Sequence, residues 1–422
     1  MKRFIVPLLV VIVVVGVIFA GCTAPAETPT APTAPTTPTA PTAPTAPTAP
    51  TEPTEPEELV FPWEGCFLKP DGTPVRVYFI TDQAANVTMS IHTKHSQGTI
   101  EAGGGEWTLL NCEQDVARQS SMLEDSLLAR PDAIVLHPVQ PPTTIPYVER
   151  GTSEGIPFFV SMMPPIVDGE LHEDIVAYVG NYQLKRGPIQ GQYIVDWAEA
   201  QGRPIKVGEM WGLYGFEEFS GPVHRTLHET VSAGYGTMTD NPIIEEWWDW
   251  GDTMFTEDLS YQVCLDGLTA NSDVDLIYCE CDCMTGGVIA ALKAMDRYYP
   301  VGDERHIAVV TGDAEDWSLA EVEAGFIDCQ VDMNIDRYTD GLVKAIWWYV
   351  VMGKSMEEVN TSFGRAGPEF DLGTSARNID VDDSLVTIDN VIEVRAKWAS
   401  YGKDYYSWPL CQDEKFIQYP TP

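Results

Sequence analysis

The sequence has few positive charges: 25 Lys and Arg residues stand against 63 Asp and Glu residues, which gives a formal net charge of −38 at pH 7. An acidic chain of this kind is repelled by nucleic acid and by anionic lipid headgroups, and its charge favours solubility. Motifs of the common enzymes are missing too. The chain has no Walker-type phosphate loop, no His-Glu-x-x-His and no Gly-x-Ser-x-Gly, and its seven His residues are scattered. We therefore expect neither nucleic-acid binding nor enzymatic activity, and we predict no cofactor.

Large apolar side chains are missing from residues 23–57, which repeat Thr-Ala-Pro and Thr-Pro-Thr and contain no apolar residue larger than Ala or Pro. Such a segment has nothing to bury and does not build a core. Its frequent proline favours extended polyproline II, which makes a semi-rigid spacer. We interpret residues 23–57 as a linker between a membrane surface and a folded body.

The first 22 residues have the order of a secretion signal. Lys2 and Arg3 precede an apolar run over 4–19, and small residues then lead to Cys22. The run is shorter than the about 20 residues that a stable membrane span needs. Residues 19–22 resemble a bacterial lipobox, in which the cysteine is lipidated and becomes the new N-terminus. An uncleaved N-terminal anchor is the alternative. Both interpretations place the body outside the cytoplasm, in the periplasm or at the cell surface, and tether it to a membrane.

Eight cysteines remain once Cys22 is assigned to the lipid. They are Cys66, Cys112, Cys264, Cys279, Cys281, Cys283, Cys329 and Cys411. An even number in an exported protein predicts disulfides, but eight cysteines allow 105 pairings and none is assigned. Cys279, Cys281 and Cys283 would share one side of a strand. A zinc site usually needs pairs spaced by two to four residues and a distant second pair. We therefore favour disulfide bonding of one or two of these three, with Cys264 as a nearby partner, and predict no metal.

Strand-like and helix-like segments alternate along the body, in two successive sets. The first set has strands over 75–80, 107–110, 133–136 and 156–160, with helices over 88–102 and 115–129 and the end of a third helix over 147–154. The second has strands over 175–179, 206–210, 275–279 and 306–311, with helices over 187–200, 222–233, 252–270 and 285–295. Asp115 is expected to cap the second helix. A helix over 342–352, a strand over 381–388 and a tail from 395 follow. Alternation with short connections predicts parallel sheets covered by helices on both faces, with ligands bound beyond the carboxyl ends of the strands. The sequence thus predicts an α/β protein with two similar lobes.

Six phrases, in this order, carry a family resemblance: Asp115–Asp125, Arg130–Pro138, Gly155–Val160, Tyr178–Tyr182, Asp273–Asp282 and Leu385–Val391. Over about 75–400 the chain resembles the type I periplasmic sugar-binding proteins, the ribose- and galactose-binding group. The resemblance implies two doubly wound parallel-sheet lobes that close on a ligand like a Venus flytrap. It implies three crossing segments, near Asn181, near Met333–Asp336 and near Val381–Ile388.

The expected domain boundaries follow from this plan. Lobe 1 comprises residues 58–181 and is completed by about 336–380. Lobe 2 comprises residues 182–335 and is completed by about 389–400. Residues 381–388 form a hinge strand, and residues 401–422 form a C-terminal tail.

A sugar needs charged or amide partners for its hydroxyls and aromatic surfaces for its ring faces. By the family's pattern, the predicted ligand-binding residues are Asp82, Asn86, Ser161, Arg225, Trp250, Asp282, Asp313 and Asn334. Alternatives remain open. Asp82 and Asp313 are also suited to capping the helices that follow them, Arg225 to a surface position, and the Trp247–Trp250 cluster to a surface patch or partner site. Asn86 also begins a glycosylation sequon. At Ser161 and Met162 the family often has Asp-Arg or Asp-Ser, and the missing Arg argues against a close ribose binder.

The function implied by the resemblance is that of a solute-binding lipoprotein of an ABC importer, which binds a sugar or polyol. Its expected partners are a permease in the membrane and, through the lipid, the membrane itself, and it is expected to act as a monomer. A receptor that presents its closed form to a sensor kinase or chemoreceptor is the alternative, which the sequence does not separate from transport. A cytoplasmic sugar-responsive repressor is excluded by the export signal and by the lack of a basic helix-turn-helix. A metal-binding lipoprotein that uses the cysteine triplet remains a further alternative.

Overall fold

The computed structural model describes residues 65–84, 87–167, 170–180, 185–216, 219–362, 378–379 and 383–400. All of them belong to one compact unit, Leu59–Pro422, and the other unit is Met1–Glu58. The predicted signal with Cys22, the linker over 23–57 and the tail over 401–422 lie outside the described residues. Within the described ranges, no helix combines the length and the apolar character that crossing a bilayer requires.

A six-stranded sheet is formed mainly by the first half of the body, in the order β13-β7-β4-β3-β1-β2, and all of its strand pairs are parallel. Its strands are β1 (Arg76–Thr81), β2 (Glu106–Asn111), β3 (Ala133–Leu136), β4 (Phe158–Ser161), β7 (Ile175–Val179) and β13 (Asn378–Ile379). Every residue of β3, β4 and β7 is buried. Near-continuous apolar runs of this kind are typical of parallel strands that are covered on both faces.

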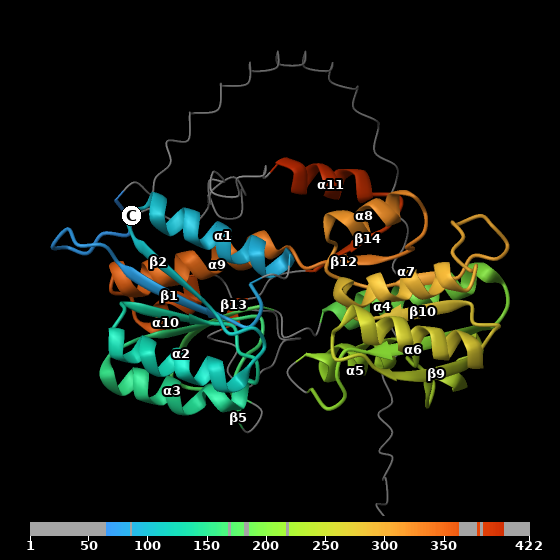
Figure 1. The fold of residues 1–422 in the computed structure, drawn as a ribbon, viewed down its shortest axis with the longest axis horizontal. Helices are drawn as coiled ribbons and strands as arrows, with labels where there is room; N and C mark the ends of the chain where they lie inside the picture. The colour runs from blue at the N-terminus through green and yellow to red at the C-terminus, as the bar shows by residue number, and fades with distance from the viewer. Residues whose placement is uncertain are drawn as a thin grey trace, which may run out of the picture. The chain divides into compact units, whose positions relative to one another are not determined.

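Two helix pairs cover this sheet. Val77 and Phe79 of β1 pack with α1 and α9, whereas Ile80 packs with α2 and α3, because successive side chains of a strand point to opposite faces. Figure 1 shows the orange α9 beside the blue α1, although the two are far apart in the sequence. As predicted, Asp115 caps its helix and accepts a hydrogen bond from the Arg118 amide at 3.0 Å. The helices are α1 (Val87–Ala102), α2 (Val116–Ala129), α3 (Pro141–Glu154), α9 (Ile335–Ile346) with its π-helical continuation η2 (Trp347–Val351), and α10 (Met356–Ser362).

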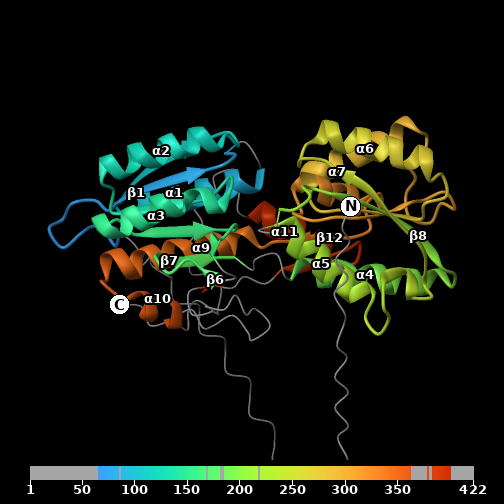
Figure 2. The same cartoon turned by 90° about the horizontal axis from the view of Figure 1, so that it is seen from below.

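A four-stranded parallel sheet, in the order β11-β10-β8-β9, forms the second half. Leu276 and Tyr278 of β10 pack with α4 and α5, whereas Ile277 packs with α6 and α7. Figure 2 shows β8 between these two helix pairs. The strands are β8 (Ile205–Trp211), β9 (Ile244–Asp252), β10 (Leu276–Cys279) and β11 (Ala308–Val310); the helices are α4 (Arg186–Gln201), α5 (Ser220–Val231), α6 (Glu257–Ala270) and α7 (Asp282–Ala294).

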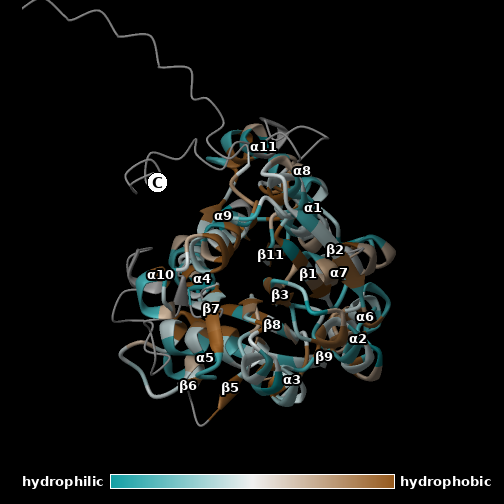
Figure 3. Ribbon diagram, turned by 90° about the vertical axis from the view of Figure 1, so that its left-hand side faces the viewer, coloured by the Kyte–Doolittle hydropathy of each residue, from teal (hydrophilic) through white to brown (hydrophobic). Residues whose placement is uncertain are grey.

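Two short strands extend this half. β12 (Gln330–Asp332) pairs antiparallel with β14 (Ser384–Val386), and a bridge between Val310 and Cys329 joins them to the edge of β11. Helices α8 (Asp316–Glu323) and α11 (Val391–Ser400) pack beside them. Small additions are β5 (Ile166–Val167), which pairs with β6 (Glu170–Leu171), and the 3-10 helix η1 (Met238–Asp240). The hydropathy colouring of Figure 3 is strongly apolar along β7 and over parts of α9, in keeping with their burial.

After β12 the chain leaves the second half and enters α9, which packs on the six-stranded sheet. It returns to the second half between β13, in that sheet, and β14, which pairs with β12. A further passage, at 181–184, lies outside the described residues. The α/β class and the parallel sheets agree with the prediction, and the lobe boundaries remain a prediction.

Three predicted elements are wrong in detail. The long helix begins at Glu257 rather than at 252, because Thr256 caps it by accepting a hydrogen bond from the Leu259 amide, and the preceding residues form β9. The segment from 395, predicted as a tail, lies partly in α11. The Trp-rich helix over 342–352 changes to a π-helix at Trp347.

Candidate ligand-binding cavity

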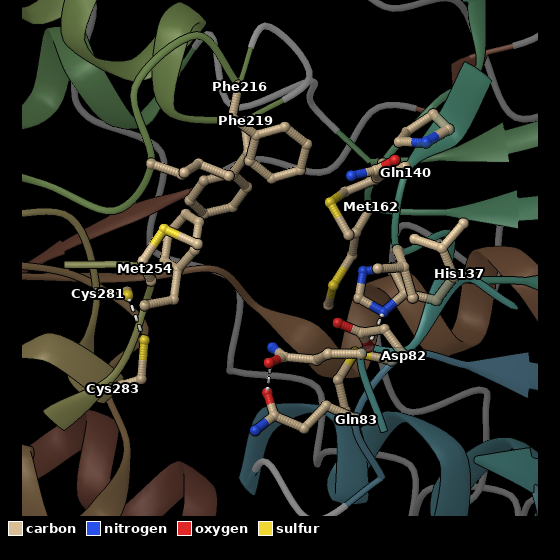
Figure 4. A pocket seen from close by; sticks show the side chains of 18 of the residues that line it. Asp82, Gln83, His137, Gln140, Met162, Phe216, Phe219, Met254, Cys281 and Cys283 are labelled. Carbon is tan, nitrogen blue, oxygen red and sulfur yellow. Dashed lines mark hydrogen bonds and ion pairs between the residues drawn. The ribbon is translucent and has the colours of Figure 1, made fainter. Parts of the chain in front are cut away.

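A cavity of about 570 Å³ is lined by residues that follow strands of both sheets. From the six-stranded sheet come the segments after β1, β2, β3 and β4; from the four-stranded sheet come those after β8, β9, β10 and β11. Every one of these segments leaves the carboxyl end of a parallel strand, which is where open α/β sheets bind ligands. Figure 4 shows the two walls, with Phe216, Met254 and Cys281 on one side and Asp82 and His137 on the other.

Asp82 and His137 are the ionisable groups of the first wall. Oδ1 of Asp82 lies 2.8 Å from Nδ1 of His137, close enough for an ion pair when the imidazole is protonated, and both side chains are largely buried. Gln119 of α2 fixes the segment after β3 with two hydrogen bonds. Its Nε2 donates to the His137 carbonyl and its Oε1 accepts from the Val139 amide, each at 3.0 Å. The first wall therefore presents a carboxylate whose position is set by two elements.

Asp313 and Arg186 form the corresponding pair of the second wall. Nη2 of Arg186 donates to Oδ1 of Asp313 at 2.9 Å, Nη1 donates to the Glu280 carbonyl at 3.1 Å, and the guanidinium lies 5.7 Å from the centre of the Phe219 ring. Burial by itself would lower the pKa of Arg186, but its anionic neighbours, first among them the Asp313 carboxylate, together outweigh burial, and the pKa rises. This fully buried cation holds the Asp313 side chain in place.

Asp313 also has a strained backbone. Its φ is +93°, which is uncommon for a residue other than glycine, and its amide donates to the Val331 carbonyl at 2.9 Å. Strain of this kind persists where the surroundings over-determine a conformation, and it clusters at ligand sites. The strained backbone and the buried Arg186 both indicate that Asp313 is held for a purpose other than capping a helix.

The rest of the lining is mostly apolar and rich in sulfur. Phe216, Phe219 and Phe255 contact one another through ring edges and faces, with centroids 5.5 to 6.5 Å apart. The sulfur-bearing residues of the lining are Met89, Met162, Met163, Met254, Met333, Cys281 and Cys283. Aromatic faces suit the C–H faces of a ring, and methionine adapts to irregular shapes.

Of the predicted ligand-binding residues, Asp82 and Asp313 line the cavity, and the structure brings them to one site. Ser161 does not reach it. Its side chain is buried and lies 2.9 Å from Nε2 of His92, while the next residue, Met162, lines the cavity instead. Asn86 lies outside the described residues.

Asp282 and Asn334 are buried within their own half. Asp282 accepts hydrogen bonds from the Glu315 amide at 2.8 Å and from Gln330 at 2.6 Å. Asn334 donates to Ser384 at 3.0 Å and accepts from Lys397 at 2.7 Å. Both tie neighbouring segments together beneath the cavity wall, and their ligand contacts remain a prediction.

Trp250 and Arg225 lie elsewhere in the second half. Two glycines make room for the Trp250 ring: a Cβ at Gly208 or Gly267 would lie 2.3 or 2.2 Å from it. The Trp250 indole donates to Asn271 at 3.1 Å. Arg225 lines a separate cavity of about 610 Å³, beside Trp211. The geometry gives neither residue a place in the first cavity, so their predicted role finds no support in it.

Beside Gly212 and Ser220 lies a largely buried network of two carboxylates and two imidazoles. Glu209 lies 2.6 Å from His228 and also contacts His224, whose other nitrogen lies 2.8 Å from Glu280. Burial opposes both charges, but the partners prevail: the pKa of Glu209 falls to about 2, and that of His224 rises to about 9. Glu280 in turn accepts from Ser220 at 2.9 Å, which anchors the start of α5 beside Phe219 of the cavity wall.

Glu209, His224 and His228 are also the group, among the described residues, whose ligand atoms lie close enough to share a metal ion, within 4.8 Å of one another. Each of the three atoms already has a hydrogen-bonding partner, and both nitrogens of His224 face carboxylates. These contacts favour an ion network over a metal site.

Sequence reasoning missed Arg186 and the network around His224. The signal for Arg186 was its place at the start of the first helix after the expected crossing near Asn181. The structure contains no disulfide among the seven cysteines that it describes, while Cys22 and Cys411 lie outside the described residues.

Comparison with known proteins identifies relatives of this chain. A family model described as the periplasmic binding protein domain matches residues 99–354. A putative rhizopine-binding protein from Rhizobium meliloti is 26% identical over 219 residues, which cover 51% of this chain and 65% of that protein, slightly less than two thirds of its length.

Solved structures share the fold. A galactofuranose-binding protein superimposes with a TM-score of 0.61 at 17% identity and covers 77% of this chain and 98% of its own. A periplasmic ribose ABC transporter protein from Conexibacter woesei gives a TM-score of 0.59 at 18% identity, with 77% and 97% covered. A solute-binding protein from Bacillus halodurans with bound myo-inositol gives 0.58 at 17% identity, with 76% and 98% covered. At these identities the likeness concerns the fold alone, and it agrees with the predicted fold class.

Proposed function

We propose that this chain, which belongs to the periplasmic binding protein family, binds a small sugar or polyol in the cavity described above and delivers it to an importer in the membrane. As a member of this family the chain is a solute-binding protein rather than an enzyme, and it works outside the cytoplasm. One observation carries the choice of ligand: Asp82 and Asp313, from different sheets, line the same cavity of about 570 Å³.

The two carboxylates suit a ligand with several hydroxyl groups. A hydroxyl donates a strong, charge-assisted hydrogen bond to an ionised carboxylate. Arg186 donates a hydrogen bond to Asp313, and Nδ1 of His137 lies 2.8 Å from Asp82, so each carboxylate has a basic neighbour before a ligand arrives. Fixed acceptors lower the cost of ordering on binding.

The apolar wall supports the same class of ligand. Phe216 and Phe219 offer ring surfaces to the C–H face of a sugar or cyclitol. The cavity volume lies within the range of about 300–1,000 Å³ that is usual for small-molecule sites. Proteins of similar fold bind myo-inositol or galactofuranose, which are compounds of this kind.

The membrane attachment and the partner belong to the proposal as well. We expect residues 1–22 to direct export, Cys22 to carry lipid, residues 23–57 to act as spacer, and an ABC permease to receive the ligand. The lobe boundaries given from the sequence, with lobe 1 over 58–181 and lobe 2 over 182–335, belong to the same proposal.

A thermal-shift screen of residues 59–422, which form one compact unit, tests the ligand class. Pentoses, hexoses, inositols, nucleosides and amines are compared, because a ligand that binds only the native state raises the unfolding midpoint. We expect a sugar or polyol to give the largest shift. A shift produced only by nucleosides or amines would contradict the proposal.

Calorimetry with the best sugar or polyol then tests the site. We expect Asp313→Ala to weaken binding more than tenfold, or by about 1.4 kcal/mol, because it removes a fixed acceptor and takes from the buried Arg186 its ion-pair partner in the cavity wall. Arg225→Ala is the matched control, since Arg225 lines the separate cavity, and its affinity should equal that of the wild type. Equal affinities for Asp313→Ala and the wild type would refute the cavity assignment.

A further inference from the structure

Two cysteines of the cavity wall are in unusually close contact. Cys281 is the N-cap of α7, and Cys283 follows after one intervening residue. Both thiols line the cavity (Figure 4), and their Sγ atoms lie 2.7 Å apart. This separation exceeds the about 2.05 Å of a disulfide bond, but it is shorter than two sulfur atoms in simple van der Waals contact would adopt. The fold therefore presses two free thiols together at a site that faces the ligand.

The other thiols differ from this pair. Cys279, only two residues earlier, is fully buried at the end of β10 and lies 3.5 Å from Oγ1 of Thr285. Cys264 is buried in the apolar core beneath α6 and α7. Within the described part of the chain, no other two thiols are in contact. Close approach is thus specific to Cys281 and Cys283.

The two thiols are unequal in access. Cys283 is partly exposed, whereas only 3% of Cys281 is exposed. Burial and the neighbouring Cys283 raise the pKa of the Cys281 thiol. Because the thiolate is the reactive form and must reach its partner, Cys283 is suited to react first and Cys281 second.

We propose that Cys281 and Cys283 are a modification site, where exchange with a disulfide-bearing oxidant joins them by a disulfide in the cavity wall. The Cys283 thiolate attacks one sulfur of the oxidant and displaces the other as a thiolate, which takes up the Cys283 proton. Cys281 then loses its proton and attacks the Cys283 sulfur, which releases the second oxidant sulfur as a thiol. Two hydrogen atoms, with two electrons, pass to the oxidant.

This inference rests on the proposed function in one respect, the location outside the cytoplasm, where disulfides form and persist. The consequence is local to the ligand site. Two S–H groups that face the cavity are replaced by one S–S bridge, and the turn that positions Asp282 and the start of α7 is fixed. The oxidised protein thus presents a wall with two fewer weak donors.

Peptide mapping of the full chain tests the bridge. Cleavage after Lys and Arg yields the peptide Thr226–Lys293, which holds Cys264, Cys279, Cys281 and Cys283. The exported chain is denatured in excess alkylating reagent without reductant. We expect two of the four cysteines to escape alkylation and all four to react after reduction. Alkylation of all four without reduction would overturn the proposal.

Variants assign the bridge. Cys281→Ser and Cys283→Ser should each abolish the protected pair, whereas the matched control Cys279→Ser should keep it. A protected pair that survives Cys281→Ser but is lost in Cys279→Ser or Cys264→Ser would also overturn the proposal, since the bridge would then join other residues.

A second measurement does not depend on export or on the ligand. The reduced, purified full chain is treated with oxidised glutathione. The wild type should release two equivalents of reduced glutathione and keep none, while Cys281→Ser should retain one glutathione on Cys283. A stable glutathione adduct on the wild type, or no reaction with oxidised glutathione, would contradict the proposed disulfide. Either result would leave the proposed ligand binding unaffected. Conversely, a ligand screen without hits leaves this result standing.

Discussion

His224 lies between two buried carboxylates, so its charge is linked to stability. Its pKa in the folded chain is about 9, against an ordinary value of 6.5. A pKa raised by folding stabilises the native state fully below the ordinary value, and this contribution is lost as the pH rises through the folded value. Glu209 behaves oppositely: its pKa falls from 4.5 to about 2, so its contribution is present above 4.5 and is lost as the pH falls through 2. The network contributes most between these limits, from about pH 4.5 to 6.5.

We predict that His224→Gln loses the alkaline part of this dependence. Between about pH 6 and pH 10 the unfolding free energy of the wild type should fall by up to about 3 kcal/mol, because the raised pKa of His224 is its source. The unfolding free energy of the variant should not show this fall. Urea unfolding across this range measures the difference between the two proteins, in which titrating groups outside the network cancel. Parallel curves for the wild type and His224→Gln would show that the network does not hold this charge.

At the scale of single residues, the sequence predicted the two carboxylates of the cavity but not the side chains that contact them. The family's pattern assigned Asp82 and Asp313, and hydrophobic runs place the strands that these two residues follow directly or closely. Ser161 follows the same rule but turns inward, because His92, 69 residues earlier, takes its hydroxyl. Arg186 was missed because Asp313, its partner, lies 127 residues further along the chain. Side-chain direction depends on such distant partners, and a local pattern does not contain them.

Helices α4 and α5 owe their close packing to glycine. A Cβ at Gly187 would lie 2.3 Å from the Val223 carbonyl oxygen and 2.7 Å from the Leu227 amide nitrogen. Both are backbone atoms of α5, so they can move away from an added Cβ only if the two helices separate. The packing of this pair covers the face of the four-stranded sheet that carries Leu276 and Tyr278.

We therefore predict that Gly187→Ala destabilises the chain by about 1–3 kcal/mol, the usual cost of overpacking, although alanine is the better helix former. Chemical denaturation monitored by circular dichroism measures the change. Gln192→Ala, at an exposed position of the same helix, is the control and should remain within about 0.5 kcal/mol of the wild type. A Gly187→Ala protein as stable as the wild type would mean that the two helices are less closely packed than described.

At the scale of elements, the continuous apolar strands could be predicted from the sequence, whereas the edge strand β9 could not. The buried strands β3, β4 and β7 are continuous apolar runs, which one sequence is enough to recognise. β9 instead mixes tryptophans with acidic residues over Ile244–Asp252 and is mostly half-buried or exposed. Its tryptophans find cover in tertiary contacts, such as the place of Trp250 between Gly208 and Gly267. Because acidic residues interrupt both a continuous apolar run and a strict alternation, β9 gave no signal for a strand.

For the whole molecule, the position of the cavity implies a motion. Asp82 and Asp313 belong to different sheets, and a small ligand satisfies both carboxylates at once only if the two walls come within hydrogen-bonding reach of it. The chain passes between the sheets in short segments, one of which is held by the contacts of Asn334 with Ser384 and Lys397. Short crossings that lie outside both sheets are where hinge closure is absorbed.

We predict that a saturating sugar or polyol, identified by the thermal-shift screen, reduces the radius of gyration of residues 59–422 measured by small-angle X-ray scattering. A ligand shifts the population toward a closed form only by as much as it binds that form more tightly than the open form. The closed form binds more tightly because both walls contact the ligand in it, so closure must depend on contacts from both walls. Asp313→Ala removes the contact of one wall, and even at saturation it should close less than the wild type. Arg225→Ala, which leaves both walls intact, should close fully. If calorimetry shows the ligand bound while the wild-type radius stays constant, the ligand is held by one half alone, and the shared cavity is not the site of capture.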